Sequence, residues 1–523
     1  MNFASVEFLC FLLVLVAVYY LVPKRAQWVV LLAGSVVFYA FAGVTCLVFL
    51  LAVIAVSYLT VAIIGKRQGA CTDWLAAHKE LPKEQRKAYK NKNKKGNLAI
   101  VCAGIAVLTI ALVYAKFVSG YFGVKVSAAG ISLGAYALEI MGISYYTFIA
   151  IGYMLDVYRE KAPVQRNFAK HALFVGFFPQ LVMGPISKYS DVGEQYFLPH
   201  ALDGKNLYCG GMRVAWGFFK KLVVADAIAP AVGAIVAQQK GGVYFLVLCL
   251  FYSIRIYGDF TGGIDIVLGT AEILGIRLPE NFNRPFSSKS TAEYWRRWHI
   301  TMGAWFTNYI FYPLSVTKSM QKLSKWSRAH LGTGVGKRLP VYITTIVTWL
   351  ATGLWHGIAW NFVVWAMLNC LVLLVSQELE PLYAKFRNKF PRLHASAPYQ
   401  TFMMVRTFCL MALIRVFDCY MDVPLTFRKF FSVFTTPNVG TLFDGGLGTL
   451  GVSTASFCVI GVGIVCMWGV SQLGKKRSVR EQLWEKPWLG SLALALVVFA
   501  VLVFGTYGLG YDASAFIYGG TFN

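Results

Sequence analysis

Long apolar runs separated by short basic stretches constrain this 523-residue chain more than any other feature. Residues 44–64, 98–118 and 448–470 are clear examples, and they hold a single Lys or Arg between them. A helix needs about 20 mostly apolar residues to cross the hydrocarbon core of a bilayer, so each run is long enough to span it. The chain is therefore expected to be an all-α polytopic membrane protein.

Composition and charge agree with this interpretation. The chain is 57% hydrophobic and 14% charged, with a formal net charge of +25. The positive charge gathers in short stretches between apolar runs, with ten Lys and Arg in residues 66–95 and six in residues 318–338. Basic stretches of this kind are typical of cytoplasmic loops facing anionic lipid. A nucleic-acid partner is not expected.

The order of apolar and basic segments predicts the topology. The first apolar run, residues 3–22, has basic residues only after it, so the N-terminus is expected outside. The last run, residues 489–504, leaves residues 508–523 outside as well. We predict about eleven transmembrane helices in one integral-membrane domain, residues 1–523.

Several apolar segments contain residues that break helices or carry charge. Residues 174–186 are interrupted by Pro179, Gly184 and Pro185, which excludes one straight helix and favours a re-entrant or broken segment lining a cavity. Asp226 and Asp259 fall within apolar surroundings, where carboxylates are functional or paired. The candidate partners are Lys220, Lys221 and Arg255.

Two of the seven histidines lie in positions of chemical interest. His299 ends a basic and aromatic stretch, and His356 lies inside the apolar segment 352–365. Burial favours the neutral imidazole, which can take a proton from a hydroxyl as a general base. A structural histidine bonded to a neighbouring helix is an equal alternative for His356, and interfacial anchoring is the stronger alternative for His299. Asn361 lies a little more than one helical turn after His356 and is expected to orient its ring if both side chains face the cavity.

The basic stretch before His299 indicates an anionic ligand. Guanidinium and ammonium groups suit the phosphates of coenzyme A or of a carrier protein's phosphopantetheine, and lipid headgroups are the competing partner. The candidate donor-binding residues are Arg284, Lys289, Arg296, Arg297 and Trp298. No phosphate-binding glycine loop is present, and the histidines do not cluster, so no metal and no bound cofactor are expected.

Five motifs occur in order between residues 140 and 370, the expected catalytic core. They are FFPQLVMGPISKY (177–189), GMRVAWGFFKKLVVADAIAP (211–230), YGDFTGGIDIVLG (257–269), ENFNRPF through EYWRRWHI (280–300) and GLWHG (353–357). Together they resemble the membrane-bound O-acyltransferase family, and most closely its bacterial polysaccharide O-acetylation branch. The resemblance implies that His356 is the catalytic histidine and His299 the second family histidine, with the helices arranged around a central tunnel.

The same resemblance implies the biological setting. It places the chain in a bacterial cell membrane, with acetyl-CoA or an acyl carrier protein thioester as the acyl donor. An extracytoplasmic SGNH-type acetyltransferase or esterase-like protein is the expected partner, besides membrane lipid. Residues 418–419, Asp-Cys, stand where the alginate branch has a different signature, which leaves the polysaccharide open.

The C-terminal tail carries a further motif. Phe516, Tyr518 and Phe522 form an FxYxxxF pattern similar to one associated with acyl relay in cell-surface acylation. A phenol activated by a base attacks a thioester, and the resulting aryl ester is a good acyl donor. We therefore expect Tyr518 to carry an acyl group. An aromatic end packed at the membrane interface is the alternative.

Two other functions remain compatible with the sequence. D-alanyl transfer from an aminoacyl carrier protein to teichoic acid uses related proteins. A transporter of a lipid-linked glycan would also contain broken helices and buried carboxylates.

Overall fold

A computed structural model describes residues 2–118, 126–128, 131–133, 140–508, 511 and 516. This part of the chain is predominantly helical. Its strands, β1 (Val126–Ala128) and β2 (Ile131–Leu133), are three residues each and pair antiparallel, with Ser127 opposite Ser132. The expected all-α class is confirmed. The chain packs as two compact units, which are described separately below.

Six helices in the described residues are long and apolar enough to cross a membrane. They are α3 (Val44–Ala77), α4 (Lys83–Val113), α12 (Val243–Ile273), α17 (Trp360–Glu378), α23 (Thr454–Leu473) and α25 (Pro487–Phe504). A further apolar helix, α1 (Val6–Leu21), is shorter. These helices confirm a multi-pass membrane protein, whereas the total of about eleven crossings stays a prediction.

Unit 1 comprises residues 1–214, 263–279 and 512–523. It contains α1, α3 and α4, the hairpin β1–β2 and part of α12. Its other helices are α2 (Gln27–Ala40), α6 (Ile143–Tyr158), α7 (Phe168–Gly176), α8 (Phe178–Leu181), α9 (Tyr189–Val192) and most of α10 (Gly204–Phe218), with the short turns η1 (Lys24–Ala26), η2 (Tyr114–Val118) and η3 (Gln195–Phe197).

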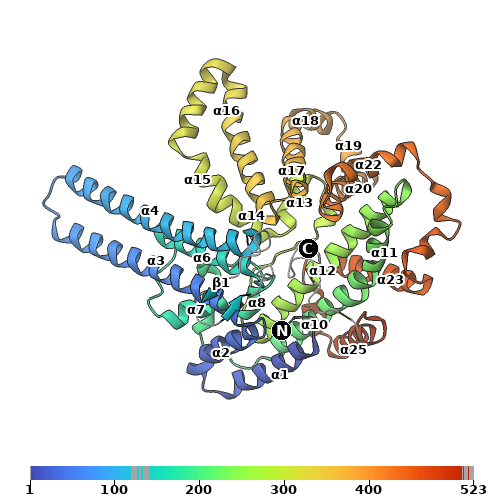
Figure 1. The fold of residues 1–523 in the computed structure, drawn as a ribbon, viewed down its shortest axis with the longest axis horizontal. Helices are drawn as coiled ribbons and strands as arrows, with labels where there is room; N and C mark the ends of the chain where they lie inside the picture. Colours follow the sequence, from blue (N-terminus) through green and yellow to red (C-terminus); the bar gives the residue numbers. More distant parts are fainter. Residues whose placement is uncertain are drawn as a thin grey trace. The chain divides into compact units, whose positions relative to one another are not determined.

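Helices α3 and α4 lie side by side as a long hairpin (Figure 1). The basic stretch 66–95 was expected as a loop, but most of it continues these two helices, and only residues 78–82 connect them. Lys, Arg, Gln and Glu are good helix formers. Near the hairpin tip the ring of Trp74 stacks on Tyr89 with centroids 3.9 Å apart, which further joins the two helices.

The segment 174–186 is broken, as its prolines and glycine predict. Helix α7 ends at Gly176, and α8 covers only Phe178–Leu181, with Pro179 in its first turn. The buried Gln180 amide then donates to the hydroxyls of Ser187 and Tyr196 at 3.2 and 3.0 Å. The polar groups of this irregular backbone region are thus partly satisfied inside unit 1.

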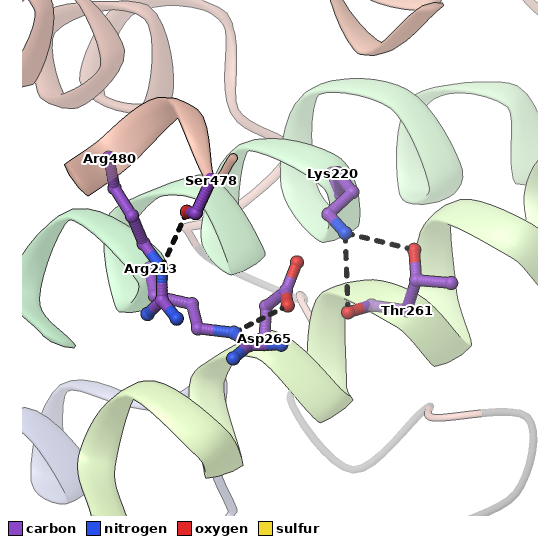
Figure 2. A network of polar contacts seen from close by, with 6 residues as sticks. All are labelled: Arg213, Lys220, Thr261, Asp265, Ser478 and Arg480. Atoms are coloured by element: carbon purple, nitrogen blue, oxygen red, sulfur yellow. Dashed lines mark hydrogen bonds and ion pairs between the residues drawn. The ribbon is translucent and has the colours of Figure 1, made fainter. Parts of the chain in front are cut away.

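An ion pair connects two helices of unit 1. Arg213 of α10 and Asp265 of α12 lie 2.9 Å apart and point toward each other (Figure 2). Gly210 and Gly269 lie on the same two helices, and a Cβ built at Gly269 would lie 2.6 Å from the Gly210 carbonyl. The two glycines therefore allow α10 and α12 to approach closely.

Unit 2 comprises residues 215–262 and 280–511. It contains α17, α23, α25 and the first part of α12. Its other elements are the π-helical turns η4 (Phe219–Ala225) and η6 (Thr307–Phe311), the 3-10 turns η5 (Pro285–Ser287), η7 (Val439–Leu442) and η8 (Gly446–Leu450), and the helices α11 (Asp226–Ala237), α13 (Thr291–Arg297), α14 (Ile300–Phe306), α15 (Tyr312–Ser315), α16 (Lys318–His356), α18 (Glu380–Lys389), α19 (Pro391–Ala395), α20 (Ala397–Arg415), α21 (Phe417–Tyr420), α22 (Val423–Thr435) and α24 (Val479–Trp484).

A buried lysine in the π-helical turn η4 forms ion pairs with two carboxylates of unit 2. The Lys221 Nζ lies 2.6 Å from Asp259 Oδ1 and 2.8 Å from Asp226 Oδ1, and its side chain is fully buried. The hydroxyl of Tyr511 donates to Asp226 Oδ2 at 2.9 Å. Lys221 is thus a partner of both intramembrane carboxylates, as one of the three candidates considered from the sequence.

The neighbouring polar residues of unit 2 have other partners. Lys220 donates to the hydroxyl and the carbonyl of Thr261 at 3.1 and 3.4 Å (Figure 2). On a separate segment, Arg480 Nε donates to Ser478 Oγ at 3.2 Å (Figure 2).

The backbone N–H of Thr506, just after α25, donates to the Leu222 carbonyl of η4 at 3.0 Å. This hydrogen bond holds the backbone that follows α25 against the π-helical turn.

Helix α16 ends at His356, and α17 begins at Trp360. His356 therefore stands at a break between two helices. Glycines lie on both sides of this histidine. A Cβ built at Gly353 would lie 2.7 Å from Ala366 Cβ, and one built at Gly357 would overlap the ring of Phe362. The GLWHG motif thus lets α17 pack closely against the end of α16.

Replacing Lys221 by Met is expected to destabilise the protein strongly. The change leaves the carboxylates of Asp226 and Asp259 buried without their cation. Breaking a buried ion pair in this way lowers the free energy of unfolding by about 3 to 5 kcal/mol. Thermal unfolding of the purified protein in lipid measures it. The exposed Lys337→Met is the matched control, and equal midpoints for both variants would contradict the prediction.

The variant Gly357→Ala is expected to lose about 1 to 3 kcal/mol of stability, because its methyl group overlaps the Phe362 ring. Gly469→Ala provides the control, since a Cβ there meets nothing within 4 Å. The control should leave the unfolding midpoint unchanged or raise it slightly. A Gly357→Ala midpoint equal to that of the control would show that the close approach at the helix junction is not needed.

Candidate active site

The basic and aromatic motif folds back on itself within unit 2. The N–H of Asn283 donates to the Arg297 carbonyl, and the N–H of Ile300 donates to the Asn281 carbonyl, both at 2.9 Å. Phe282 and Trp298 form an isolated antiparallel bridge between these bonds. The backbone of residues 281–283 is therefore held against residues 297–300.

His299 stands at the end of this paired segment. Its φ of 47° and ψ of 54° are left-handed, and it is the residue that precedes α14. A non-glycine residue in this region costs on the order of 1 kcal/mol or more, and such strain often accompanies functional sites. The left-handed turn separates α13 from α14 and sets the direction of the imidazole.

The polar contacts of His299 are made with Asn281. The His299 Nδ1 lies 3.1 Å from Asn281 Oδ1, and the same oxygen accepts from the N–H and hydroxyl of Thr301 at 3.1 and 3.0 Å. His299 is 2% exposed. Among the described residues, neither His299 Nε2 nor Asn281 Nδ2 has a hydrogen-bond partner.

Burial fixes the protonation state of His299. The residue lies outside the six helices that are long and apolar enough to span a membrane. Desolvation lowers the pKa of its imidazole to about 3. The ring of Phe260 meets it edge to face, with centroids 4.9 Å apart. His299 is consequently neutral at physiological pH.

His356 lies at the end of α16 among aromatic rings and is 5% exposed. Its ring is 4.7 Å from Trp355, 4.8 Å from Trp365 and 6.0 Å from Phe362, measured between centroids. The Phe362 ring is stacked on it, with an interplanar angle of 18°. Aromatic rings therefore pack against this imidazole from several directions.

The structure brings His299 and His356 into one aromatic cluster. The indole of Trp355 neighbours both rings, at 6.3 Å from His299 and 4.7 Å from His356. These two histidines belong to motifs that are more than fifty residues apart in the sequence. Both are buried in unit 2 among aromatic rings, so the environment they share is apolar.

The two supporting residues named from the sequence lie in different surroundings. Asn361 donates from Nδ2 to the Phe417 carbonyl at 3.2 Å and to the Met421 sulfur at 3.4 Å, which links the start of α17 to α21. Asp259 belongs to the ion cluster of Lys221. A role of Asn361 in orienting His356 stays a prediction.

The candidate donor-binding residues divide into exposed and enclosed groups. Lys289 and Arg296 are exposed. Arg297 forms an ion pair with Glu293 at 2.6 Å and donates to the Arg284 carbonyl at 3.4 Å, and Arg284 itself is half-buried. Their ability to hold a phosphate stays a prediction.

Trp298 is buried against side chains of unit 2. Its ring stacks on Tyr294 with centroids 5.6 Å apart, and the Arg415 guanidinium carbon lies 4.2 Å from its centroid. The same arginine donates to the Tyr294 hydroxyl at 2.6 Å. A cation over an indole face is a favourable contact when both are desolvated. Trp298 therefore supports the His299 turn from inside unit 2.

Tyr518 lies outside the described residues. Phe516, the first residue of the FxYxxxF pattern, is described and is 4% exposed within unit 1. A Cβ built at Gly263 of α12 would lie 3.1 Å from the Phe516 ring and would overlap the Met183 sulfur. The missing side chain at Gly263 thus leaves room for both residues.

Sequence reasoning overlooked Asn281. Asn281 lies in the same run of polar and aromatic residues that leads to His299, but the backbone pairing that joins the two residues is not visible in the sequence. No group of three metal-ligating side chains occurs in the part of the chain that the structure covers.

Comparison with known proteins identifies the family. The model of the membrane-bound O-acyltransferase family matches residues 159–333. The probable alginate O-acetylase AlgI of Azotobacter vinelandii is 31% identical over 394 residues, which cover 72% of this chain and 69% of that protein. The peptidoglycan O-acetyltransferase of Helicobacter pylori is 30% identical over 283 residues, covering 49% and 50%.

A third relative has a different acyl group in its name. The teichoic acid D-alanyltransferase of Streptococcus thermophilus is 25% identical over 248 residues, which cover 46% of this chain and 57% of that protein. The family match includes His299 and the paired segment before it. Given the extent of the match to the alginate relative, the chain belongs to the membrane-bound O-acyltransferase family and is an O-acyltransferase.

Proposed function

We propose that this protein transfers an acetyl group from a cytoplasmic thioester to a hydroxyl reached from outside, for O-acetylation of an extracellular or cell-envelope polysaccharide. The observation that carries the proposal is the aromatic cluster with two buried imidazoles, His299 and His356. The similarity to an alginate O-acetylase and a peptidoglycan O-acetyltransferase supports the choice of acetyl and of a polysaccharide.

The chemistry assigns the two imidazoles to the reacting groups. A neutral ring accepts the proton of the attacking hydroxyl while the new ester bond forms, and a second ring nearby can hydrogen-bond to the thioester or to the leaving sulfur. The surrounding aromatic side chains exclude water, which would otherwise hydrolyse the thioester. His299 and His356 are the proposed catalytic residues.

The donor is proposed to reach the site from the cytoplasmic side. Acetyl-CoA is the simplest donor, and an acyl carrier protein thioester is the other. The exposed Lys289 and Arg296, with Arg284 and Arg297 nearby in sequence, supply positive charge for its phosphates. Transferring only the acyl group avoids moving a charged donor through lipid, which would be costly.

The acceptor is proposed to be the Tyr518 phenol or a hydroxyl of an extracytoplasmic SGNH-type partner. The burial of Phe516, the first residue of the same motif, supports a role of this motif. The partner would pass the acetyl group to the glycan. Both termini are proposed to lie outside, as the charge pattern predicts.

D-alanyl transfer to teichoic acid is the second candidate, because a teichoic acid D-alanyltransferase is among the relatives. The alginate O-acetylase and the peptidoglycan O-acetyltransferase are more similar to this chain, and they favour the acetyl group. Offering acetyl-CoA and a D-alanyl carrier-protein thioester to the same vesicles separates the two. Membership of an acyltransferase family disfavours a glycan transporter.

Acyl transfer is expected to depend on both histidines. With radiolabelled acetyl-CoA and protein in lipid vesicles, His356→Ala and His299→Ala should each lower the rate of transfer by roughly 100- to 10,000-fold, the usual contribution of a positioned base. His171→Ala, a buried histidine of unit 1, is the control. Full rates in both site variants would reject the proposed catalytic residues.

A relay through Tyr518 predicts a hydroxylamine-sensitive label on the protein itself. Tyr518→Phe should remove this label, because the ester has no oxygen on which to form. Tyr507→Phe tests another phenol that precedes the tail and should retain it. Undiminished label in Tyr518→Phe would exclude the relay and leave direct transfer to the partner.

The neutral state of His299 predicts an effect of pH on stability. The ordinary pKa of histidine is 6.5, and the pKa of the buried His299 is about 3. Between these two pH values, His299 binds a proton in the unfolded chain but not in the folded chain. The free energy of unfolding should therefore decrease as the pH is lowered below 6.5, by at most about 1.4 kcal/mol for each pH unit. In thermal unfolding, the stability of the wild type relative to His299→Gln should drop between pH 7.5 and 5. A constant difference would contradict the burial of a neutral ring.

A further inference from the structure

The Asn281 side chain reveals which nitrogen of His299 carries the proton. The backbone N–H of Thr301 points at one atom of the Asn281 amide, 3.1 Å away. A backbone N–H can only donate, so the atom that it meets must be the amide oxygen. This fixes the orientation of the Asn281 amide, which otherwise has two nearly equivalent positions.

The same oxygen lies 3.1 Å from His299 Nδ1. An amide oxygen can only accept, so Nδ1 must donate and carry a hydrogen. The neutral imidazole then has its lone pair on Nε2. This atom is buried, and it has no hydrogen-bond partner among the residues that the structure describes.

We propose that Asn281 is a positioning residue for acyl transfer, which holds His299 as the Nδ1–H tautomer so that Nε2 is the atom that accepts the proton of the nucleophile. This inference rests on the proposed function. It assigns the base to a particular atom and gives Asn281 a part in catalysis without contact with the substrate.

The proton transfers in this step balance. The hydroxyl oxygen bonds to the thioester carbon while its proton moves to His299 Nε2. When the intermediate collapses, the carbon–sulfur bond breaks and the Nε2 proton passes to the sulfur, which leaves as a thiol. The imidazolium formed in between donates from Nδ1 to Asn281 Oδ1, a hydrogen bond that strengthens when the ring is charged.

The backbone around Asn281 supports this role. The Asn281 carbonyl accepts from Ile300, and its side-chain oxygen accepts from Thr301, so the residue is bonded to both residues that follow His299. Asn281 is fully buried. Its oxygen is therefore fixed relative to the imidazole, as a tautomer-defining group must be.

Nitrogen NMR of the full-length protein in lipid nanodiscs tests the tautomer directly. With ¹⁵N-labelled histidine, the signals that disappear in His299→Gln identify the ring. The wild type should show a protonated Nδ1 and an unprotonated Nε2. An Nε2–H ring in the wild type would overturn the inference, and this measurement needs no Asn281 variant that folds.

Variants at Asn281 test the cause. Asn281→Leu removes the acceptor and should move His299 toward the Nε2–H tautomer and lower acyl transfer at least about tenfold, part of the usual effect of a base. Asn281→Asp keeps an acceptor and should keep the Nδ1–H form. Asn369→Leu, also a buried asparagine of unit 2, should leave the His299 tautomer unchanged. An unchanged tautomer and rate in Asn281→Leu would overturn the proposal.

The failure of this inference can be distinguished from that of the proposed function. Full transfer by His299→Gln would reject His299 as the base, and with it the catalytic consequence of Asn281. An inactive His299→Gln together with an Nε2–H ring in the wild type would keep the histidine in the proposed function but reject the role of Asn281.

Discussion

The hydrogen bonds that converge on the Asn281 side-chain oxygen hold the candidate site in place. Three donors meet there, from His299 and from the backbone and hydroxyl of Thr301. A left-handed residue such as His299 is strained, and the surrounding bonds must compensate for that strain. The tautomer of the imidazole follows from this one oxygen, while the left-handed turn at His299 sets the direction of the ring.

Burial gives the site its chemical character. The rings of Phe260 and Trp355 contact His299, while Trp355, Phe362 and Trp365 surround His356. A low-dielectric environment strengthens each hydrogen bond formed during the reaction and would keep water from the proposed thioester. It also makes unpaired polar atoms expensive, so the three hydrogen bonds that meet at the Asn281 side-chain oxygen have a large influence on the site.

The ion cluster of Lys221 illustrates the same constraint in another part of unit 2. One ammonium group is shared by two carboxylates, and the Tyr511 phenol bonds to one of them. Since Tyr511 follows α25, the cluster connects the π-helical turn and α12 to the beginning of the tail. Charges buried in this way are stable only when every partner is present.

Much of the fold could be predicted from local sequence. Apolar runs indicated α3 and α23, and the prolines at 179 and 185 indicated the broken segment. These features depend on residues close together in the chain. The helical continuation of the basic stretch 66–95 was missed because charge was taken to mean a loop, although those residues favour helices.

The candidate site could be predicted only in part. The two histidines were found because polar residues are rare in such segments, but their common neighbour Trp355 was not. Trp298 stays a predicted donor-binding residue, and the contact of its ring with Arg415, more than one hundred residues later in the chain, could not be predicted. The pairing of Asn281 with His299 likewise depends on the folded backbone, which no local pattern shows.

The most direct measurement is a cryo-EM structure of the full-length protein in lipid, bound to a non-reactive thioether analogue of acetyl-CoA. The account predicts that the carbon standing for the thioester carbonyl lies inside the aromatic cluster, with His299 Nε2 near the position of the attacking oxygen, itself about 3 to 3.5 Å from that carbon. An analogue bound only at the exposed basic residues, with both imidazoles still enclosed and inaccessible, would contradict it.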